Sequence, residues 1–279
     1  MRSHVSAARA EDPEGIHQLR VASRRLRAAL TEYRPAIESE PRQRLNTLAR
    51  EITQHLGRAR ELDVMETLLM VEREPLKGVA RLAVNEALAC VRSARQAARG
   101  DVAHAADLAD SLDLDQSLLD VFAALHAPKK CHLKHVQARL GKRWEALCAC
   151  FDTWMSDADD EILHDLRKAA KKFRYSCELY LDLYPRGLED FINGLKTVQQ
   201  DVGMWNDYRV LRAELKRCAS EADRHAAPGF PEVFQTLDER ITIHRDAFQA
   251  HAATFFGDEH RHSAAASFRL VDGVCCRKR

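Results

Sequence analysis

The sequence is poor in glycine, proline and aromatic residues, and it has almost no excess of either charge. Its 279 residues include only 11 glycines and 8 prolines, and aromatic side chains make up 6%. Few turn formers and few aromatics, together with abundant Ala, Leu, Arg and Glu, predict a mostly helical protein. No alternating segment typical of a strand is present. The totals of 43 Lys and Arg against 42 Asp and Glu exclude a wholly basic nucleic-acid coat.

Long apolar runs and paired cysteine motifs are also missing. No stretch approaches the roughly 20 apolar residues that a membrane-spanning helix needs, and the first residues lack the apolar centre of a secretory signal. We therefore expect no membrane partner and a cytoplasmic localisation. The eight cysteines include no C-x-x-C pair. Several lie among Ala and Leu in helical pattern, which is typical of small buried thiols in a reducing compartment.

Helix start and stop signals divide the chain into segments of unequal length. Residues 101–120 form an acidic, less regular stretch, and we predict an irregular tail over 258–279. The predicted helices lie at about residues 13–34, 41–57, 61–72, 76–99, 129–155, 157–183, 188–202, 207–221 and 231–256.

A weak internal repeat organises the sequence. Residues 17–27, with the sequence HQLRVASRRLR, return 147 positions later at residues 164–174 as HDLRKAAKKFR. A second pair follows at nearly the same offset, LGRARELDV at 56–64 and VGMWNDYRV at 202–210. Two matches in register indicate a duplicated helical unit.

Glycine occupies the same place in both copies of the second pair. We predict that Gly57 and Gly203 end helices, as glycines just beyond the last turn do. On that interpretation Asp63, Asn206 and Asp207 cap or brace the helix that follows.

Each copy of the first motif places basic residues on one side of a helix. At 100° per residue, four residues of the first copy fall within about an 80° arc, and apolar residues fall on a separate arc that can face a core. The basic residues of the first copy are His17, Arg20, Arg24 and Arg27. Those of the second copy are His164, Arg167, Lys171 and Arg174, flanked by Lys168 and Tyr175.

These basic stripes stack like charges at helical spacing. Such a helix is destabilised by repulsion until an anionic ligand or neighbouring acids offset it. The planar guanidinium of arginine suits phosphate, because it makes two hydrogen bonds and stays charged. The stripe from His17 to Arg27 spans about 15 Å, which fits an extended polyanion better than a single phosphate. A third arc, on the predicted helix at 129–155, holds His132, His135, Arg139 and Lys142.

The paired motifs resemble the CHAD domain, the conserved histidine α-helical domain, over about residues 13–257. The resemblance implies a single all-α domain within residues 1–257, built as two four-helix bundles related by pseudo-twofold symmetry. The first repeat would cover about 13–126 and the second about 129–257. It further implies a basic central groove or pore that binds inorganic polyphosphate and, in bacteria, an association with polyphosphate granules.

Matching the family motif assigns polyphosphate-binding roles to two groups of residues. They are His17, Arg20, Arg24, Arg25 and Arg27 in the first copy, and His164, Arg167, Lys171, Lys172 and Arg174 in the second. We add the flanking Lys168 and Tyr175, and from helical phase Arg139, Lys142 and Arg143. Family members usually carry a helix before the first motif, whereas about a dozen residues precede Asp12 here. The E-x-E-x-K signature of the triphosphate-tunnel enzymes often fused to this domain does not occur.

Two other functions stay open. His17 or His164 could carry a phosphoryl group in a transfer or polyphosphate-processing enzyme, but no acid that could hold Mg²⁺ lies on either stripe before Glu32 or Glu178. A basic helix could also contact nucleic-acid phosphates, although aromatics for base stacking are few. We predict a non-catalytic polyphosphate-binding module with no cofactor or metal, and the sequence predicts no oligomeric state.

Overall fold

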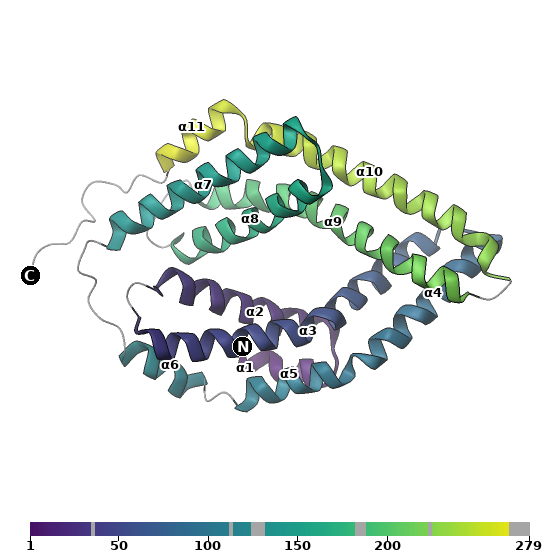
Figure 1. Cartoon of the computed structure of the whole chain (residues 1–279), viewed down its shortest axis with the longest axis horizontal. Coiled ribbons are helices and arrows are strands. Elements are labelled where there is room, and N and C mark those ends of the chain that lie inside the picture. The colour runs from purple at the N-terminus through teal and green to yellow at the C-terminus, as the bar shows by residue number, and fades with distance from the viewer. Residues whose placement is uncertain (35–36, 112–113, 124–131, 182–187, 223–224, 268–279) are drawn as a thin grey trace, which may run out of the picture. The chain divides into compact units, whose positions relative to one another are not determined.

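The protein is described here by a computed structural model that covers residues 1–34, 37–111, 114–123, 132–181, 188–222 and 225–267 (Figure 1). Within these ranges it is all-α, as predicted, and it contains no strand. None of the described helices is long and apolar enough to cross a bilayer. The helices are α1 (Arg2–Arg9), α2 (Pro13–Glu32), α3 (Ser39–Arg73), α4 (Gly78–Ala97), α5 (Arg99–Ser111), α6 (Leu114–Ala123), α7 (His132–Ser156), α8 (Asp160–Leu179), α9 (Leu188–Glu221), η3 (Ala227–Gly229), α10 (Phe230–Phe255) and α11 (Asp258–Ser267).

The two helices that carry the repeated motif, α2 and α8, begin in the same way. Asp12 precedes α2, and its side chain accepts a hydrogen bond from the Gly15 amide at 2.8 Å. Asp159 precedes α8, and its side chain accepts from the Glu161 amide at 2.6 Å. Each cap satisfies an amide that has no partner within the helix. Both helices have 20 residues, so the duplication extends to their starts and lengths.

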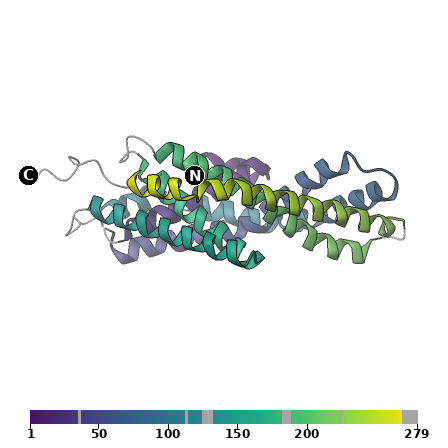
Figure 2. The same ribbon diagram turned by 90° about the horizontal axis from the view of Figure 1, so that it is seen from above.

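The chain folds into two compact units that each combine separate stretches. Unit 1 contains Met1–His126 and Asp207–Ile241, and unit 2 contains Ala127–Asn206 and Thr242–Arg279. Helices α9 and α10 therefore contribute one end to each unit. Ion pairs join α9 to α10 in both units, between Arg212 and Asp238 in unit 1 and between Asp201 and His251 in unit 2. The two helices run next to each other in Figure 2.

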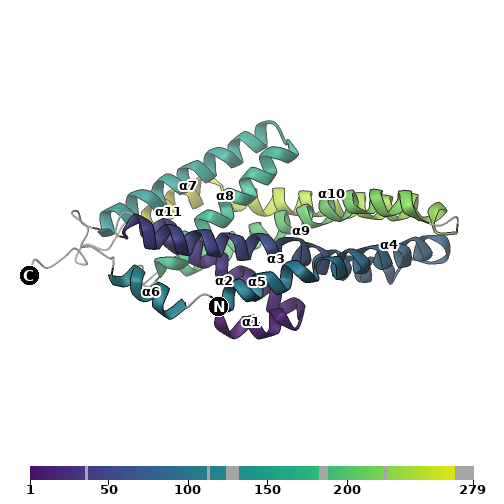
Figure 3. The same ribbon diagram turned by 60° about the horizontal axis from the view of Figure 1, so that its bottom comes forward.

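The core of unit 1 around α2 is built from aliphatic side chains. Helix α1 packs on α2 and α5, and α2 packs along α3 (Figure 3). The largest buried residues at these contacts are Ile16, Leu19, Ile52 and Leu56. Gly15 lies where α1 meets α2. A Cβ at this position would come within 2.6 Å of the Ala7 backbone, so the close contact requires glycine.

The core of unit 2 concentrates the few aromatic residues of the chain. Trp144 of α7 stacks on Phe256 with ring centroids 5.6 Å apart, and Phe151 stacks on the same ring at 4.5 Å. Trp154 meets Phe248 of α10 edge to face at 4.9 Å. Large rings bury much apolar area at small entropic cost. The buried residues of α8, among them Leu166 and Phe173, lie apart from its basic stripe, as the sequence predicts.

Several predicted helix boundaries are wrong. Gly57 and Gly203 do not end helices: they lie inside α3 and α9, which run through the predicted breaks at 58–60 and 203–206. Glycine costs only about 1 kcal/mol inside a helix. In α3 the burial of Leu56 and Leu62 on either side of the glycine outweighs that cost.

Other segments are more helical than their sequence suggests. The acidic stretch at 101–120 lies mainly in α5 and α6, and residues 258–267 of the predicted irregular tail form α11. Residues 268–279 lie outside the described part. The short helix α1 precedes α2, as the longer α7 precedes α8.

Enlarging Gly15 should loosen the packing of α1 on α2. We expect Gly15→Ala to lower the free energy of unfolding by about 1–3 kcal/mol, because the methyl group would overlap the Ala7 backbone. The matched control is Gly141→Ala in α7, where a Cβ meets no described atom within 4 Å. That control should leave stability unchanged or raise it by up to about 1 kcal/mol. Urea denaturation measures both, and equal stability of the two variants would contradict the packing.

Candidate functional site

The first basic stripe lies on α2 where that helix packs against α3. The Arg20 guanidinium donates a hydrogen bond to the backbone carbonyl of Thr53. The same guanidinium reaches Gly57, since a Cβ placed there would lie 3.6 Å from Arg20 Nη1. The interior glycine of α3 therefore leaves space for an arginine of α2, and any side chain longer than alanine would compete for it.

A buried hydroxyl pair holds the two helices together below the stripe. Ser23 Oγ and Thr53 Oγ1 lie 2.8 Å apart, and both residues are buried. Each hydroxyl also lies within hydrogen-bonding distance of a backbone carbonyl of its own helix, that of Arg20 for Ser23 and that of Ala49 for Thr53. Since each has one hydrogen, one hydroxyl donates to the other hydroxyl, which donates to its own carbonyl. The contact satisfies both polar groups, as burial requires. It also fixes α2 in register with α3.

Two arginines of α3, Arg50 and Arg60, join the stripe. Burial lowers the pKa of His17, and the charge of Arg60 is the next cause, followed by those of Arg20 and Arg24; Glu14 opposes them. Motif matching did not assign Arg60 or Arg50 a role. Arg60 lies within the second repeated segment, so the repeat could have pointed to it, whereas nothing in the sequence marks Arg50. The α2–α3 cluster consists of His17, Arg20, Arg24, Arg27, Arg50 and Arg60.

Arg27 shows how crowded this cluster is. Its pKa is lowered, first by burial and then by the charges of Arg50 and Arg24. Its Nε atom is buried and has no hydrogen-bond partner among the described residues. A half-buried cation beside two others is unfavourable unless negative charge approaches. Arg25, which the motif match also includes, is the exposed member of the first copy.

The second stripe lies on α8, and its histidine contacts α9. His164 Nδ1 is 3.3 Å from Asn206 Oδ1. Asn206 stands where the repeat places Arg60, so the long helix of each copy presents a polar residue to the motif histidine. Asp63, Asn206 and Asp207 do not cap helices, because all three lie inside α3 or α9. Asp63 is buried in α3 and accepts a hydrogen bond from Arg95 Nε at 2.7 Å.

Acidic neighbours compensate part of the second stripe. Arg174 pairs with Glu178 at 2.7 Å, and its guanidinium lies 5.1 Å from the centre of the Tyr175 ring. Lys168 pairs with Asp165 at 2.6 Å, and the hydrogen bond from Lys168 lowers the pKa of Asp165. This second pair is exposed on both sides and therefore contributes little to stability. It leaves Lys168 free to exchange its partner for a ligand.

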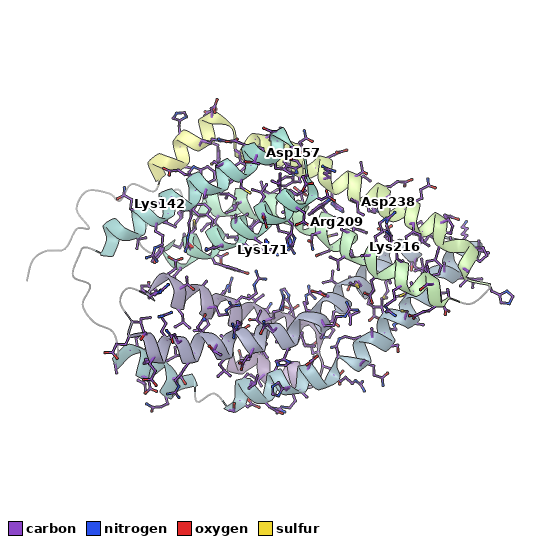
Figure 4. All side chains as sticks on the ribbon, viewed as in Figure 1. Lys142, Asp157, Lys171, Arg209, Lys216 and Asp238 are labelled. Atoms are coloured by element: carbon purple, nitrogen blue, oxygen red, sulfur yellow. The ribbon has the colours of Figure 1, made fainter. Side chains whose placement is uncertain are left out.

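Helix α7 adds basic residues beside α8. Arg143 donates a hydrogen bond to the buried hydroxyl of Ser176. Lys142 of α7 is exposed, and Lys171 of α8 is half-buried (Figure 4). The side chains of His132 and His135 lie outside the described part. The α7–α8 cluster consists of Arg139, Lys142, Arg143, His164, Arg167, Lys171 and Lys172.

Histidines elsewhere in the described part make separate contacts. His251 pairs with Asp201 at 2.7 Å, and His262 Nδ1 lies 2.7 Å from the Asp258 carbonyl. His260 packs against Phe255 with ring centroids 5.1 Å apart. No group of three or more His, Cys, Asp and Glu side chains in the described ranges is placed to hold a metal ion. The described basic clusters are thus suited to binding anions by charge and hydrogen bonding.

Comparison with known proteins identifies similar domains. The family model of the CHAD domain matches residues 1–216. Among solved structures, the crystal structure of the CHAD domain from the plant Ricinus communis resembles this chain with a TM-score of 0.61 and 23% identity, over 96% of this chain and 86% of that one. At that identity the likeness concerns the fold. A comparison with curated proteins gives no match.

The pKa of His17 should depend on Arg60. We expect NMR titration to place the His17 pKa below 6.5, and Arg60→Gln to raise it because one repelling charge is lost. Since the folded pKa lies below the unfolded one, His17 should cost stability as the pH falls below about 6.5. Lys77→Gln, at the start of α4, is the control and should leave the titration unchanged. An unshifted His17 pKa in Arg60→Gln would contradict the cluster.

Proposed function

This chain belongs to the CHAD domain family, and we propose from that membership and from its basic clusters that it binds inorganic polyphosphate without turning it over. The observation that carries the proposal is the like-charge crowding in the α2–α3 cluster. Both His17 and Arg27 have lowered pKa values for which neighbouring arginines are partly responsible. A bound anion would reverse that penalty, so ligand and protein would stabilise each other.

The length of the cluster suits a chain of phosphates. Residues 17 to 27 of α2 cover about 15 Å at 1.5 Å per residue, and Arg50 and Arg60 accompany that row on α3 over a similar length. A single orthophosphate would meet only one or two of these side chains. Polyphosphate presents a negative charge at every unit, so it would engage the row along its length.

The family resemblance extends the proposal to both clusters. On that basis we propose two bundles related by pseudo-twofold symmetry and a basic central groove in which the α2–α3 and α7–α8 clusters hold one polyphosphate chain. Calorimetry with a long chain tests this, because a shared chain gives one binding event that variants in either cluster weaken. Two independent events, each removed by variants in one cluster, would oppose it. Association with polyphosphate granules in the cytoplasm stays a prediction.

Removing charge from the α2–α3 cluster should weaken polyphosphate binding. Arg24→Gln with Arg60→Gln is preferred to changes at Arg20, because Arg20 also bonds the Thr53 carbonyl and helps to hold α2 on α3. We expect the dissociation constant to rise by at least about tenfold at low salt. The slope of log K against log salt should fall by about 1–2, since fewer counterions are released.

A matched double variant separates this effect from a general loss of charge. Lys77→Gln with Arg92→Gln removes the same charge from two exposed positions of unit 1, one just before α4 and one on it. Its affinity should stay within about twofold of the unchanged protein. Equal weakening of polyphosphate binding by both double variants would show that only net charge matters. Circular dichroism should show unchanged helicity in both double variants.

Polyphosphate should bind more tightly than nucleic acid and stay intact. We expect long-chain polyphosphate to displace single-stranded RNA at equal phosphate concentration, because the basic rows carry few aromatics for base stacking. The chain length of the ligand, followed on a gel, should not change during incubation. RNA that resists displacement would favour a nucleic-acid binder. Shortened chains, or radiolabel retained on His17 or His164, would favour the phosphoryl-transfer enzyme. No polyphosphate binding at low salt would overturn the proposal.

A further inference from the structure

Two cysteines of unit 1 lie side by side on different helices. Cys90 is a half-buried residue of α4, and Cys218 is a buried residue of the part of α9 that belongs to unit 1. Both are free thiols, and Cys90 lies near enough to Cys218 to help raise the pKa of Cys218. They are 128 positions apart in the sequence, so only the fold brings them together. The polyphosphate proposal uses neither of them.

A fixed positive charge lies next to this pair. Arg217, the residue before Cys218, donates from Nη2 to Cys90 Sγ at 3.2 Å. Its guanidinium also pairs with Glu214 at 2.9 Å and with Glu221 at 3.1 Å, and these two carboxylates orient it. The contact places a charged hydrogen-bond donor on the Cys90 sulfur, where it can stabilise the negative charge on that sulfur when it reacts. The pKa of Arg217 is raised, first by the Glu214 hydrogen bond and then by the charge on Cys90.

The two thiols have different environments. Burial, followed by the hydrogen bond with Cys90, raises the pKa of Cys218 to about 12, so Cys218 stays protonated. Cys90 is the member that solvent reaches and that the guanidinium contacts. Redox pairs show the same difference. The accessible cysteine is oxidised first, and the less accessible cysteine then forms a disulfide with it.

We propose that Cys90 and Cys218 form a reversible disulfide, which links α4 to α9, when the protein meets a peroxide. The Cys90 thiolate attacks one oxygen of hydrogen peroxide, the O–O bond breaks, and Cys90 becomes a sulfenic acid as hydroxide leaves. The Cys218 sulfur then attacks the Cys90 sulfur, and the sulfenic oxygen departs as water with the thiol proton. Two thiols are oxidised and one peroxide is reduced, and a small dithiol reverses the link.

Peptide mapping of the full chain tests this proposal. The protein is treated with hydrogen peroxide at low molar excess, its remaining thiols are alkylated, and it is digested with trypsin without reduction. Cleavage after Arg and Lys places Cys90 in the peptide 82–92 and Cys218 in the peptide 218–224, each with no other cysteine. We expect these peptides to be joined, with the loss of two hydrogen atoms, and to separate on treatment with dithiothreitol.

Three variants define what the result means. Cys148→Ser with Cys150→Ser is the matched control and should form the link at the unchanged rate, because these two cysteines lie on α7 in unit 2. Cys90→Ser should leave Cys218 alkylatable after peroxide treatment and denaturation. Arg217→Gln should slow the link several-fold without changing the circular dichroism spectrum.

Other outcomes would overturn the proposal. Conversion of Cys90 to sulfinic acid with no joined peptide would show that Cys218 does not reach it. A joined peptide found only in a covalent dimer on a non-reducing gel would assign the bond to two chains. An unchanged rate of disulfide formation in Arg217→Gln would show that the Arg217 guanidinium does not assist the reaction. None of these outcomes bears on polyphosphate binding, which is measured with the reduced protein.

Discussion

The packing of α2 on α3 is the contact on which the first basic cluster depends. This packing sets the basic residues of α2 next to Arg50 and Arg60 of α3. Between the helices, Ser23 and Thr53 share a hydrogen bond, and Gly57 leaves room for the end of the Arg20 side chain. Arg20 closes the contact by bonding a backbone carbonyl of α3. The apolar face of α2 determines where this helix packs, and the same packing sets Arg27 of α2 beside Arg50 of α3.

The two copies of the motif have diverged in how their charge is compensated. In α8, Glu178 and Asp165 pair with Arg174 and Lys168. In α2, the neighbours that act on Arg27 are themselves arginines. The duplication therefore preserves the placement of basic residues while the surrounding charges differ.

The sequence predicts the helical class and the motif-bearing helices well, because capping residues and apolar periodicity are local signals. Helix α2 begins directly after Asp12, at the predicted residue 13, whereas α8 begins after Asp159 and not at the predicted residue 157. It fails at Gly57 and Gly203, where the local signal for a helix end is overridden by packing on both sides. Arg50 is a residue of the α2–α3 cluster that the sequence does not predict. Its place beside Arg27 depends on the register of α3 against α2, which involves residues distant in sequence.

Some arginines of unit 1 are paired with carboxylates, and the pairs differ between the faces of α3. Arg58, next to Gly57 on α3, pairs with Glu214 of α9 at 2.7 Å, and the same carboxylate oxygen accepts from Arg217 beside Cys90. Although burial alone would raise the pKa of Glu214, its hydrogen bonds from Arg217 and Arg58 lower it. The unit therefore has acids that compensate arginines on the faces of α3 turned toward α4 and α9. Toward α2, the same helix places Arg60 beside His17 and Arg50 beside Arg27.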